Sequence, residues 1–184
     1  LILTSIKNGQ ILPGIIPTLS DLLTNGKATY SERINAAEIL IGMGADGIKA
    51  VVGAYHCSLS ADKETVQLRI GILRLLYSGH FSPKDICNVL IDYMSPHDDF
   101  SSVELWDFET VMPTIDAIEV MDQLSVIFTE ESDDDGYRST RSELARFVRN
   151  LISGILATGL DLEGERLNRW LLFSNNLERY GHIE

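Results

Sequence analysis

The chain has 184 residues, of which 45% are hydrophobic and 23% are charged, and this composition is typical of a single globular domain. The formal net charge of −12 at pH 7 disfavours binding to nucleic acid or to an anionic membrane, because both attract clustered Lys and Arg. Lys or Arg interrupts the longest apolar stretches before they reach the roughly 18 residues that cross a bilayer, and two cysteines are too few for a disulfide scaffold. We therefore expect a protein of a reducing compartment, the cytoplasm, with no membrane contact.

The negative charge is concentrated in one part of the chain. Residues 85–137, which we call the acidic block, contain fifteen Asp or Glu residues and no Lys or Arg. The rest of the chain contains twelve acidic and all fifteen basic residues, a net charge of +3. Such a block favours contact with a basic partner, or it serves solubility alone.

Apolar residues three and four positions apart predict three helices in the first part of the chain, over residues 9–25, 31–43 and 48–57. Ser31 is the expected N-cap of the second helix, and Gly44 is its expected C-terminal cap. From Glu64 to Tyr77, apolar side chains cover most of the helix circumference. This pattern predicts a helix buried between layers, at the centre of the fold.

Helix-start signals recur in the second part of the chain. Ser82-Pro83-Lys84-Asp85 combines an N-cap serine, a proline at the first helical position and an acid in the first turn, and the helix is expected to end near Tyr93. Ser101-x-x-Glu104 and Thr140-x-x-Glu143 are capping boxes, which predict two more helix starts. A last amphipathic helix is expected from about Leu162 to Tyr180.

The helix that begins at Pro113 has an amphipathic pattern. Its apolar stripe, expected in the core, consists of Ile115, Ile118, Met121, Leu124, Ile127 and Phe128. Its other face carries three acids, Asp116, Glu119 and Asp122. We therefore expect this helix and the one before it to present carboxylates on the side away from the core.

No segment shows sustained alternation of apolar and polar residues, so we predict an all-α chain of about eight helices with short connections. The helices come in pairs. The starts expected near Ser31 and Glu64 are about 33 residues apart, and those near Ile48 and Pro83 are about 35 residues apart. Stacked helix pairs produce a period in this range, because one pair alone cannot cover its apolar face.

The first of these units resembles a HEAT repeat through Ile15-Ile16-Pro17, Leu19, Leu22-Leu23, Arg33, Ala36-Ala37, Leu40 and Met43. The segment Gly44-Ala45-Asp46-Gly47 is similar to the junction between two HEAT units. A second, looser unit contains Val51, Tyr55, Asp62, Val66, Arg69, Leu73 and Leu76. Asp62 and Arg69 stand roughly where the family has its Asp and Arg, and the first unit lacks that Asp.

The resemblance implies a right-handed superhelix of antiparallel helix pairs, a scaffold that binds another macromolecule. Residues 9–94 would form HEAT-like units, residues 97–136 an acidic irregular unit, and residues 138–181 a C-terminal helix pair. All of them are expected to lie in one domain, 1–184. An irregular helical bundle is the structural alternative.

The sequence shows no catalytic or metal-binding signature. Glu131, Asp133 and Asp135 before Gly136 have the spacing of a calcium loop, but Ser142 stands where a bidentate Glu is required. The four histidines are scattered, without metal-ligand spacing. We therefore expect no metal, no cofactor and no catalytic residue, and hence no enzyme. The densest basic cluster is expected to pair with the acidic loop before it instead of binding nucleic acid: Arg138, Arg141, Arg146 and Arg149.

These observations lead to a functional hypothesis. We expect a protein–protein interaction scaffold that binds a basic protein partner by charge steering around an apolar or aromatic anchor. Trp106 is the expected anchor, and the alternative is that it belongs to the core. The expected contact residues are Asp98, Asp99, Glu104, Trp106, Asp107, Glu109, Asp116, Glu119, Asp133, Asp134 and Asp135. Two other functions stay open: an immunity- or inhibitor-type protein that neutralises a basic toxin or nuclease, and an enzyme whose site only the fold assembles.

Overall fold

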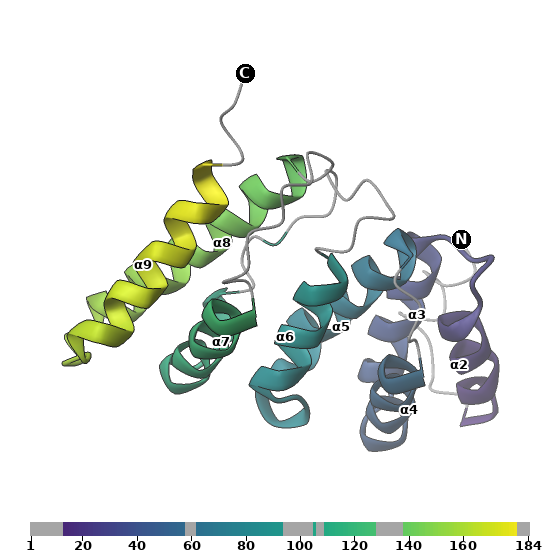
Figure 1. The fold of residues 1–184 in the computed structure, drawn as a ribbon. Coiled ribbons are helices and arrows are strands. Elements are labelled where there is room, and N and C mark those ends of the chain that lie inside the picture. The colour runs from purple at the N-terminus through teal and green to yellow at the C-terminus, as the bar shows by residue number, and fades with distance from the viewer. Residues whose placement is uncertain (1–12, 58–61, 94–104, 106–108, 128–137, 180–184) are drawn as a thin grey trace. The chain divides into compact units, whose positions relative to one another are not determined.

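The computed structural model describes residues 13–57, 62–93, 105, 109–127 and 138–179 (Figure 1). These residues form eight α-helices and two short 3-10 helices, with no strand among them, so the prediction of an all-α fold is confirmed. The α-helices are α2 (Ile16–Thr24), α3 (Tyr30–Gly42), α4 (Ala45–Cys57), α5 (Lys63–His80), α6 (Pro83–Tyr93), α7 (Thr114–Ile127), α8 (Arg138–Ala157) and α9 (Gly164–Arg179). The 3-10 helices are η1 (Pro13–Ile15) and η2 (Glu109–Val111). Within the described residues, no helix combines the length and the hydropathy that crossing a membrane requires.

Contacts along the chain define two compact units, an N-terminal unit of residues 1–76 and a C-terminal unit of residues 77–184. The N-terminal unit contains α2, α3, α4 and most of α5, and the C-terminal unit contains α6 to α9. The single domain expected from the sequence stays a prediction.

The first turn of α3 shows why this helix begins where it does. The Glu32 N–H donates to Thr29 Oγ1 (3.4 Å), and the Thr29 N–H donates in return to Glu32 Oε2 (2.9 Å). This reciprocal pair is a capping box with Thr29 as the N-cap. The expectation that Ser31 caps α3 is therefore wrong, because a Glu follows Thr29 at the third position and Ser31 lies inside the helix.

The corner between α3 and α4 depends on two glycines. Gly44 has a φ of 85°, in the left-handed region that ends many helices, so its predicted capping role is confirmed. A Cβ on Gly47 would lie 1.8 Å from the carbonyl oxygen of Leu40. The absence of a side chain at Gly47 therefore lets the backbone of α4 approach that of α3.

A buried arginine joins three helices of the N-terminal unit. Arg33 on α3 is 2% exposed. Its Nε donates to the Leu23 carbonyl (2.9 Å) at the end of α2, and its Nη1 donates to Thr65 Oγ1 (3.3 Å) on α5. Burial lowers the pKa of Arg33, and the charges of Asp62 and Glu64 oppose that shift. The guanidinium thus donates a hydrogen bond to the Leu23 carbonyl, which has no partner within α2 because it lies in the last turn of that helix.

The helix α5 is buried over most of its length, as its sequence predicts. Five of its apolar residues are at most 2% exposed: Val66, Leu68, Ile70, Ile72 and Leu73. The Arg69 guanidinium lies over the Tyr55 ring of α4, 5.2 Å from its centroid, which is cation–π geometry. Leu75 is one of the apolar residues between Glu64 and Tyr77 that the sequence predicts to be buried, but it is 44% exposed. Helical geometry stops at Ser78, and Gly79 has a φ of 93°.

The C-terminal unit begins with the helix start that the sequence predicts. The Ser82 N–H and Oγ both donate to Asp85 Oδ2, at 2.9 and 2.7 Å, and α6 follows from Pro83. Its core combines aromatic and aliphatic side chains of α6 to α9, each at most 3% exposed: Ile86, Leu90, Tyr93, Val120, Met121, Leu124, Leu144, Phe147, Val148, Trp170 and Phe173. Burying each of these side chains contributes roughly 1.5–3 kcal/mol before the entropic cost of ordering it.

Two other helix starts differ from the sequence prediction. The capping box Ser101-x-x-Glu104 lies outside the described residues, but Leu105 has no helical structure and residues 109–111 form a 3-10 helix. The second box, Thr140-x-x-Glu143, falls inside α8, which begins at Arg138. A capping-box pattern therefore marks a helix start only when the residues before it are not already helical.

Candidate interaction surface

Most of the predicted contact residues lie outside the described residues: Asp98, Asp99, Glu104, Trp106, Asp107, Asp133, Asp134 and Asp135. The roles predicted for them, including that of Trp106 as anchor, stay predictions. Glu109 begins η2, and Asp116 and Glu119 both lie on α7. The described part of the predicted surface is therefore α7 and its surroundings.

Asp116 has a partner inside the C-terminal unit. The hydroxyl of Tyr77 donates to Asp116 Oδ2 at 2.8 Å. Burial raises the pKa of Tyr77 well above its usual value, and the hydrogen bond to Asp116 and the charges of Asp116, Glu119 and Asp85 raise it further. Carboxylates of α6 and α7 thus act on one buried phenol, which shows that negative charge gathers at this part of the unit.

Glu119 differs from Asp116 because it is exposed. Its Oε1 accepts a hydrogen bond from Gln123 Nε2 of the next helical turn (3.1 Å). Its charge also acts inward, since burial and then Glu119 raise the pKa of the Cys87 thiol to about 12. Glu119 therefore faces solvent and still contributes to the negative potential at the core.

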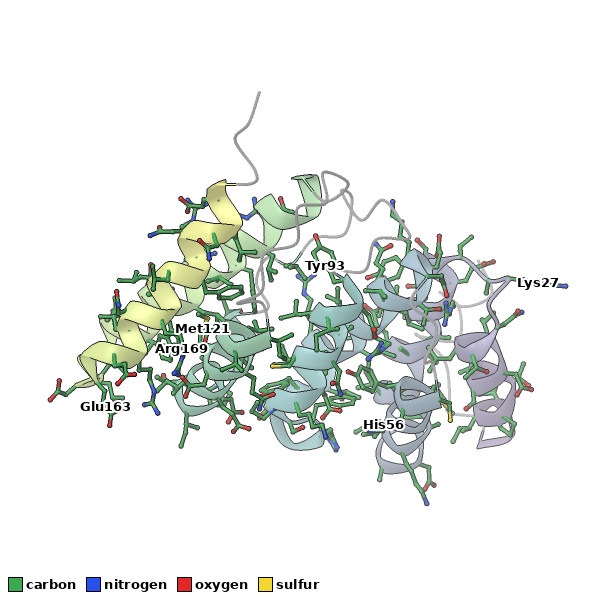
Figure 2. The ribbon with its side chains drawn as sticks, viewed as in Figure 1. Lys27, His56, Tyr93, Met121, Glu163 and Arg169 are labelled. Atoms are coloured by element: carbon green, nitrogen blue, oxygen red, sulfur yellow. The ribbon has the colours of Figure 1, made fainter. Side chains whose placement is uncertain are left out.

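Asp122, the third acid of α7, holds α9. Its Oδ1 accepts from Arg169 Nη2 and from Trp170 Nε1, both at 3.0 Å, and its Oδ2 lies 3.4 Å from Arg166 Nε. Arg169 Nε donates in addition to Ser125 Oγ (3.2 Å), and Figure 2 shows Arg169 extending from α9 toward α7. The expectation that α7 turns all three acids away from the core is therefore wrong for Asp122, because α9 packs over that side.

Apolar side chains on α7 complete its exposed face. Ile115 is 75% exposed and Val126 is 61% exposed. Residues 115, 119 and 126 are separated by four and seven positions, so they follow one line along the helix, which we call the α7 outer face. Ile115 and Ile127, expected in the core, are exposed, and the buried side chains of α7 are Ala117, Val120, Met121, Leu124 and Ser125.

The signal for this face was present in the sequence. α7 carries two overlapping apolar stripes, and the one that contains Ala117, Val120 and Leu124 is buried. Local periodicity does not choose between two stripes, since the packing partner decides.

Two arginines of α8 have partners on helices. Arg149 pairs with Glu178 of α9 (2.8 Å), and Arg146 pairs with Glu143 one turn earlier. The loop that was expected to pair with them, and the calcium-like segment Glu131–Gly136, lie outside the described residues. Within the described residues, no group of three or more His, Cys, Asp or Glu side chains is placed to hold a metal ion.

Comparisons with known proteins give no relative for this chain. No protein-family model matches it, no curated protein matches it in sequence, and no solved structure matches it. The HEAT-repeat resemblance and the superhelical arrangement therefore stay predictions.

Proposed function

We propose that the chain is a non-enzymatic, HEAT-like helical scaffold that binds a basic protein partner through the acidic block. In this proposal the α7 outer face (Ile115, Glu119 and Val126) is part of the contact. The apolar side chains would supply the anchor, and the carboxylates of the block would steer the partner and fix its orientation.

The observation that carries this proposal is the exposure of Ile115, at 75%, on a helix in the centre of the acidic block. Large apolar side chains that stand beside acids on an exposed helix face favour a protein contact, because a partner removes their apolar area from water. Ile115 and Val126 are eleven residues apart, which is roughly 16 Å along an α-helix. A partner segment of about three helical turns would cover both.

The hydrogen bonds of α7 divide its acids by role. Asp116 and Asp122 are used by the fold, since they accept hydrogen bonds from Tyr77 and from Arg169 and Trp170. Glu119 is exposed and bonds only to a neighbouring side chain of its own helix among the contacts that we describe. Glu119 is therefore the acid of α7 that a basic partner would meet.

The test compares three variants of the full chain in capture experiments at low and high salt. The first is Ile115→Ser with Val126→Ser, the second is Glu119→Gln with Glu109→Gln, and the control is Leu171→Ser with Leu172→Ser. Leu171 and Leu172 of α9 are 44% and 56% exposed, so the control removes apolar surface outside the acidic block. Captured proteins are identified by mass spectrometry and their affinities are then measured.

A specific partner should lose about tenfold or more in affinity with the apolar variant, which is the loss expected for an interface anchor. It should lose less with the charge variant, mainly in association rate and mainly at low salt. A partner that is lost only with the α9 control would move the contact to α9 and contradict the proposal. Catalytic turnover of a small molecule by the purified chain would favour the enzyme alternative instead.

A further inference from the structure

The outward side of α9 is uncharged over its two central turns. Four exposed residues follow one another at spacings of three, one and three: Asn168, Leu171, Leu172 and Asn175. Residues at these spacings lie on one face of a helix, which we call the α9 outer face. The two leucines are 44% and 56% exposed, and neither asparagine side chain forms a hydrogen bond with the described residues.

The opposite side of α9 is used by the fold. It packs against α7 and α8 of the same unit, and Figure 1 shows α9 at the edge of that unit. Trp170 and Phe173 are at most 3% exposed. Arg166 and Arg169 extend to Asp122 of α7, so these two positive charges lie on the side of α9 that is turned away from its outer face.

The α9 outer face is complementary to itself. Its residues have the same order in both directions along the helix: Asn, Leu, Leu, Asn. Two antiparallel copies of α9, related by a twofold axis between Leu171 and Leu172, would bring the four leucines together at that axis. Asn168 of each copy would then lie opposite Asn175 of the other. A side-chain amide has donors and an acceptor, so each asparagine pair can exchange hydrogen bonds, and a twofold interface requires such self-complementarity.

Charge also favours a second copy of the chain at this face, in the antiparallel orientation. Two chains that each carry a net charge of −12 repel one another, and the repulsion is weakest where the touching surfaces carry no carboxylate. The exposed Glu165 stands three residues before Asn168. An antiparallel contact places the two Glu165 side chains at opposite ends, whereas a parallel contact would place them side by side. The antiparallel orientation also opposes the two helix dipoles.

We propose that the chain forms a homodimer in which the α9 outer faces of two copies pack antiparallel. The face extends over seven residue steps, roughly 10 Å along the helix. A contact of this length falls below the roughly 1,200 Å² at which standard protein interfaces begin. The dimer should therefore be reversible, with a dissociation constant in the micromolar range or weaker. This inference does not rest on the proposed function, since the α7 outer face has no part in the contact.

The first test measures the molecular mass by sedimentation equilibrium between about 1 μM and about 1 mM protein. The wild type should pass from monomer toward dimer over this range. Leu171→Ser with Leu172→Ser should weaken association by about tenfold or more, because the leucines are the apolar centre of the contact. The control, Ile115→Ser with Val126→Ser, removes exposed apolar side chains from α7 and should dimerise like the wild type. Circular dichroism checks that both variants fold.

Three outcomes of this test would overturn the proposal. The first is a wild type that stays monomeric over the whole range. The second is equal association of the wild type and the leucine variant. The third is a dimer that only the α7 variant loses, because the contact would then lie on the α7 outer face.

The second test determines the orientation. Asn168→Lys with Asn175→Glu places opposite charges across both ends of an antiparallel contact, so association should tighten by about threefold or more at low salt. Asn168→Lys with Asn175→Lys places like charges there and should weaken association by about tenfold. High salt should reduce both effects. A parallel contact would bring like charges together in both variants. Weakening by both variants, or no effect of either, would therefore overturn the antiparallel contact.

Discussion

The two units each use a charged side chain to join helices, but they place that charge in different surroundings. In the N-terminal unit, Arg33 is 2% exposed and its acceptors are neutral, the Leu23 carbonyl and the Thr65 hydroxyl. In the C-terminal unit, the Asp122 side chain is 28% exposed and its donors include two arginines. A buried charge depends on every partner it has, whereas water can replace part of what a half-exposed charge loses. Substitution of Arg33 should therefore lower the free energy of unfolding more than substitution of Asp122 does.

The largest effect is expected for Arg33→Leu. The substitution removes the donor from the buried Leu23 carbonyl and the Thr65 hydroxyl, and each unsatisfied group costs roughly 1–3 kcal/mol. We expect the free energy of unfolding to fall by about 3 kcal/mol in urea titrations. The control is Arg146→Leu on α8, which removes an exposed ion pair with Glu143 and should cost less than about 1 kcal/mol. Equal losses for the two variants would remove the contrast between buried and exposed charges.

Close backbone packing gives the next prediction. In Gly47→Ala the new Cβ would collide with the Leu40 carbonyl of α3, and a backbone atom cannot rotate away. We expect a loss of about 2 kcal/mol, in the range of overpacked cores. Gly53 lies on the same helix, and a Cβ there would meet nothing within 4 Å. Gly53→Ala should therefore be neutral or stabilise by up to about 1 kcal/mol, and the difference between the two variants is read from thermal unfolding.

The corner between α3 and α4, with Gly44 and Gly47, also shows how far the sequence predicts the fold. Periodicity and capping residues place most helices, because they act over one or two turns: Ser82 and Asp85 determine the start of α6, and Gly44 ends α3. The contact between Gly47 and Leu40 depends on the angle at which α4 meets α3. Local patterns carry no information about that angle.

The candidate surface was less predictable than the fold. The acidic block is visible as composition, but the role of each acid depends on distant partners. Asp122 accepts from Trp170, forty-eight residues later in the chain, and the helices that pack on α7 decide which of its apolar stripes is buried. Ile115 is therefore exposed although its spacing is that of a core residue. The sequence indicated where the charge is, and tertiary packing decided which side chains remain in solvent.

For the C-terminal unit the comparison predicts a smaller loss. Asp122→Ala leaves Trp170 Nε1 and two arginines without their shared acceptor, and we expect a cost of about 1–2 kcal/mol after allowance for solvent. Asp122→Asn keeps an oxygen for the Trp170 N–H and should cost less than Ala. The loss for the Ala variant should shrink in high salt, because salt screens the exposed arginines. A loss as large as that of Arg33→Leu, independent of salt, would show that Asp122 behaves as a buried charge.

Each unit contains one cysteine, and the two thiols should differ in reactivity and in response to pH. Cys57 on α4 is exposed, and Cys87 on α6 is buried. Burial, with the charge of Glu119, raises the pKa of Cys87 from 9.0 to about 12. A thiol reagent should modify Cys57 in the native protein and Cys87 only as the C-terminal unit opens.

The raised pKa of Cys87 also sets the sign of a pH effect. Above pH 9.0 the unfolded chain loses a proton that the folded chain keeps, so the free energy of unfolding should fall as pH rises. The contribution of one such group reaches about 1.4 kcal/mol one pH unit higher. Cys57→Ser should leave this slope unchanged, and Cys87→Ala should make it shallower. If neither substitution changes how the free energy of unfolding depends on pH, that dependence arises from other groups. Candidates are the buried Tyr77 and Tyr93, whose pKa values are also raised.

The smallest effect tests the start of α3. Thr29→Ala removes the oxygen that accepts the Glu32 N–H, and loss of an N-cap costs about 1 kcal/mol. Ser31→Ala is the matched control, since Ser31 is exposed within the helix and should change stability by less than about 0.5 kcal/mol.

The pH dependence separates this cap from a simple loss of packing. Hydrogen bonds from the Thr29 backbone and side chain lower the pKa of Glu32 below 4.5 in the folded protein. The stabilisation that they give is present above that value and is lost as pH falls through the folded pKa. The difference between the wild type and Thr29→Ala should therefore be full at neutral pH and shrink in acid. A difference that stays constant down to strongly acidic pH would mean that the Thr29 hydroxyl does not stabilise the Glu32 carboxylate, because the backbone N–H of residue 29 donates to that carboxylate in both proteins.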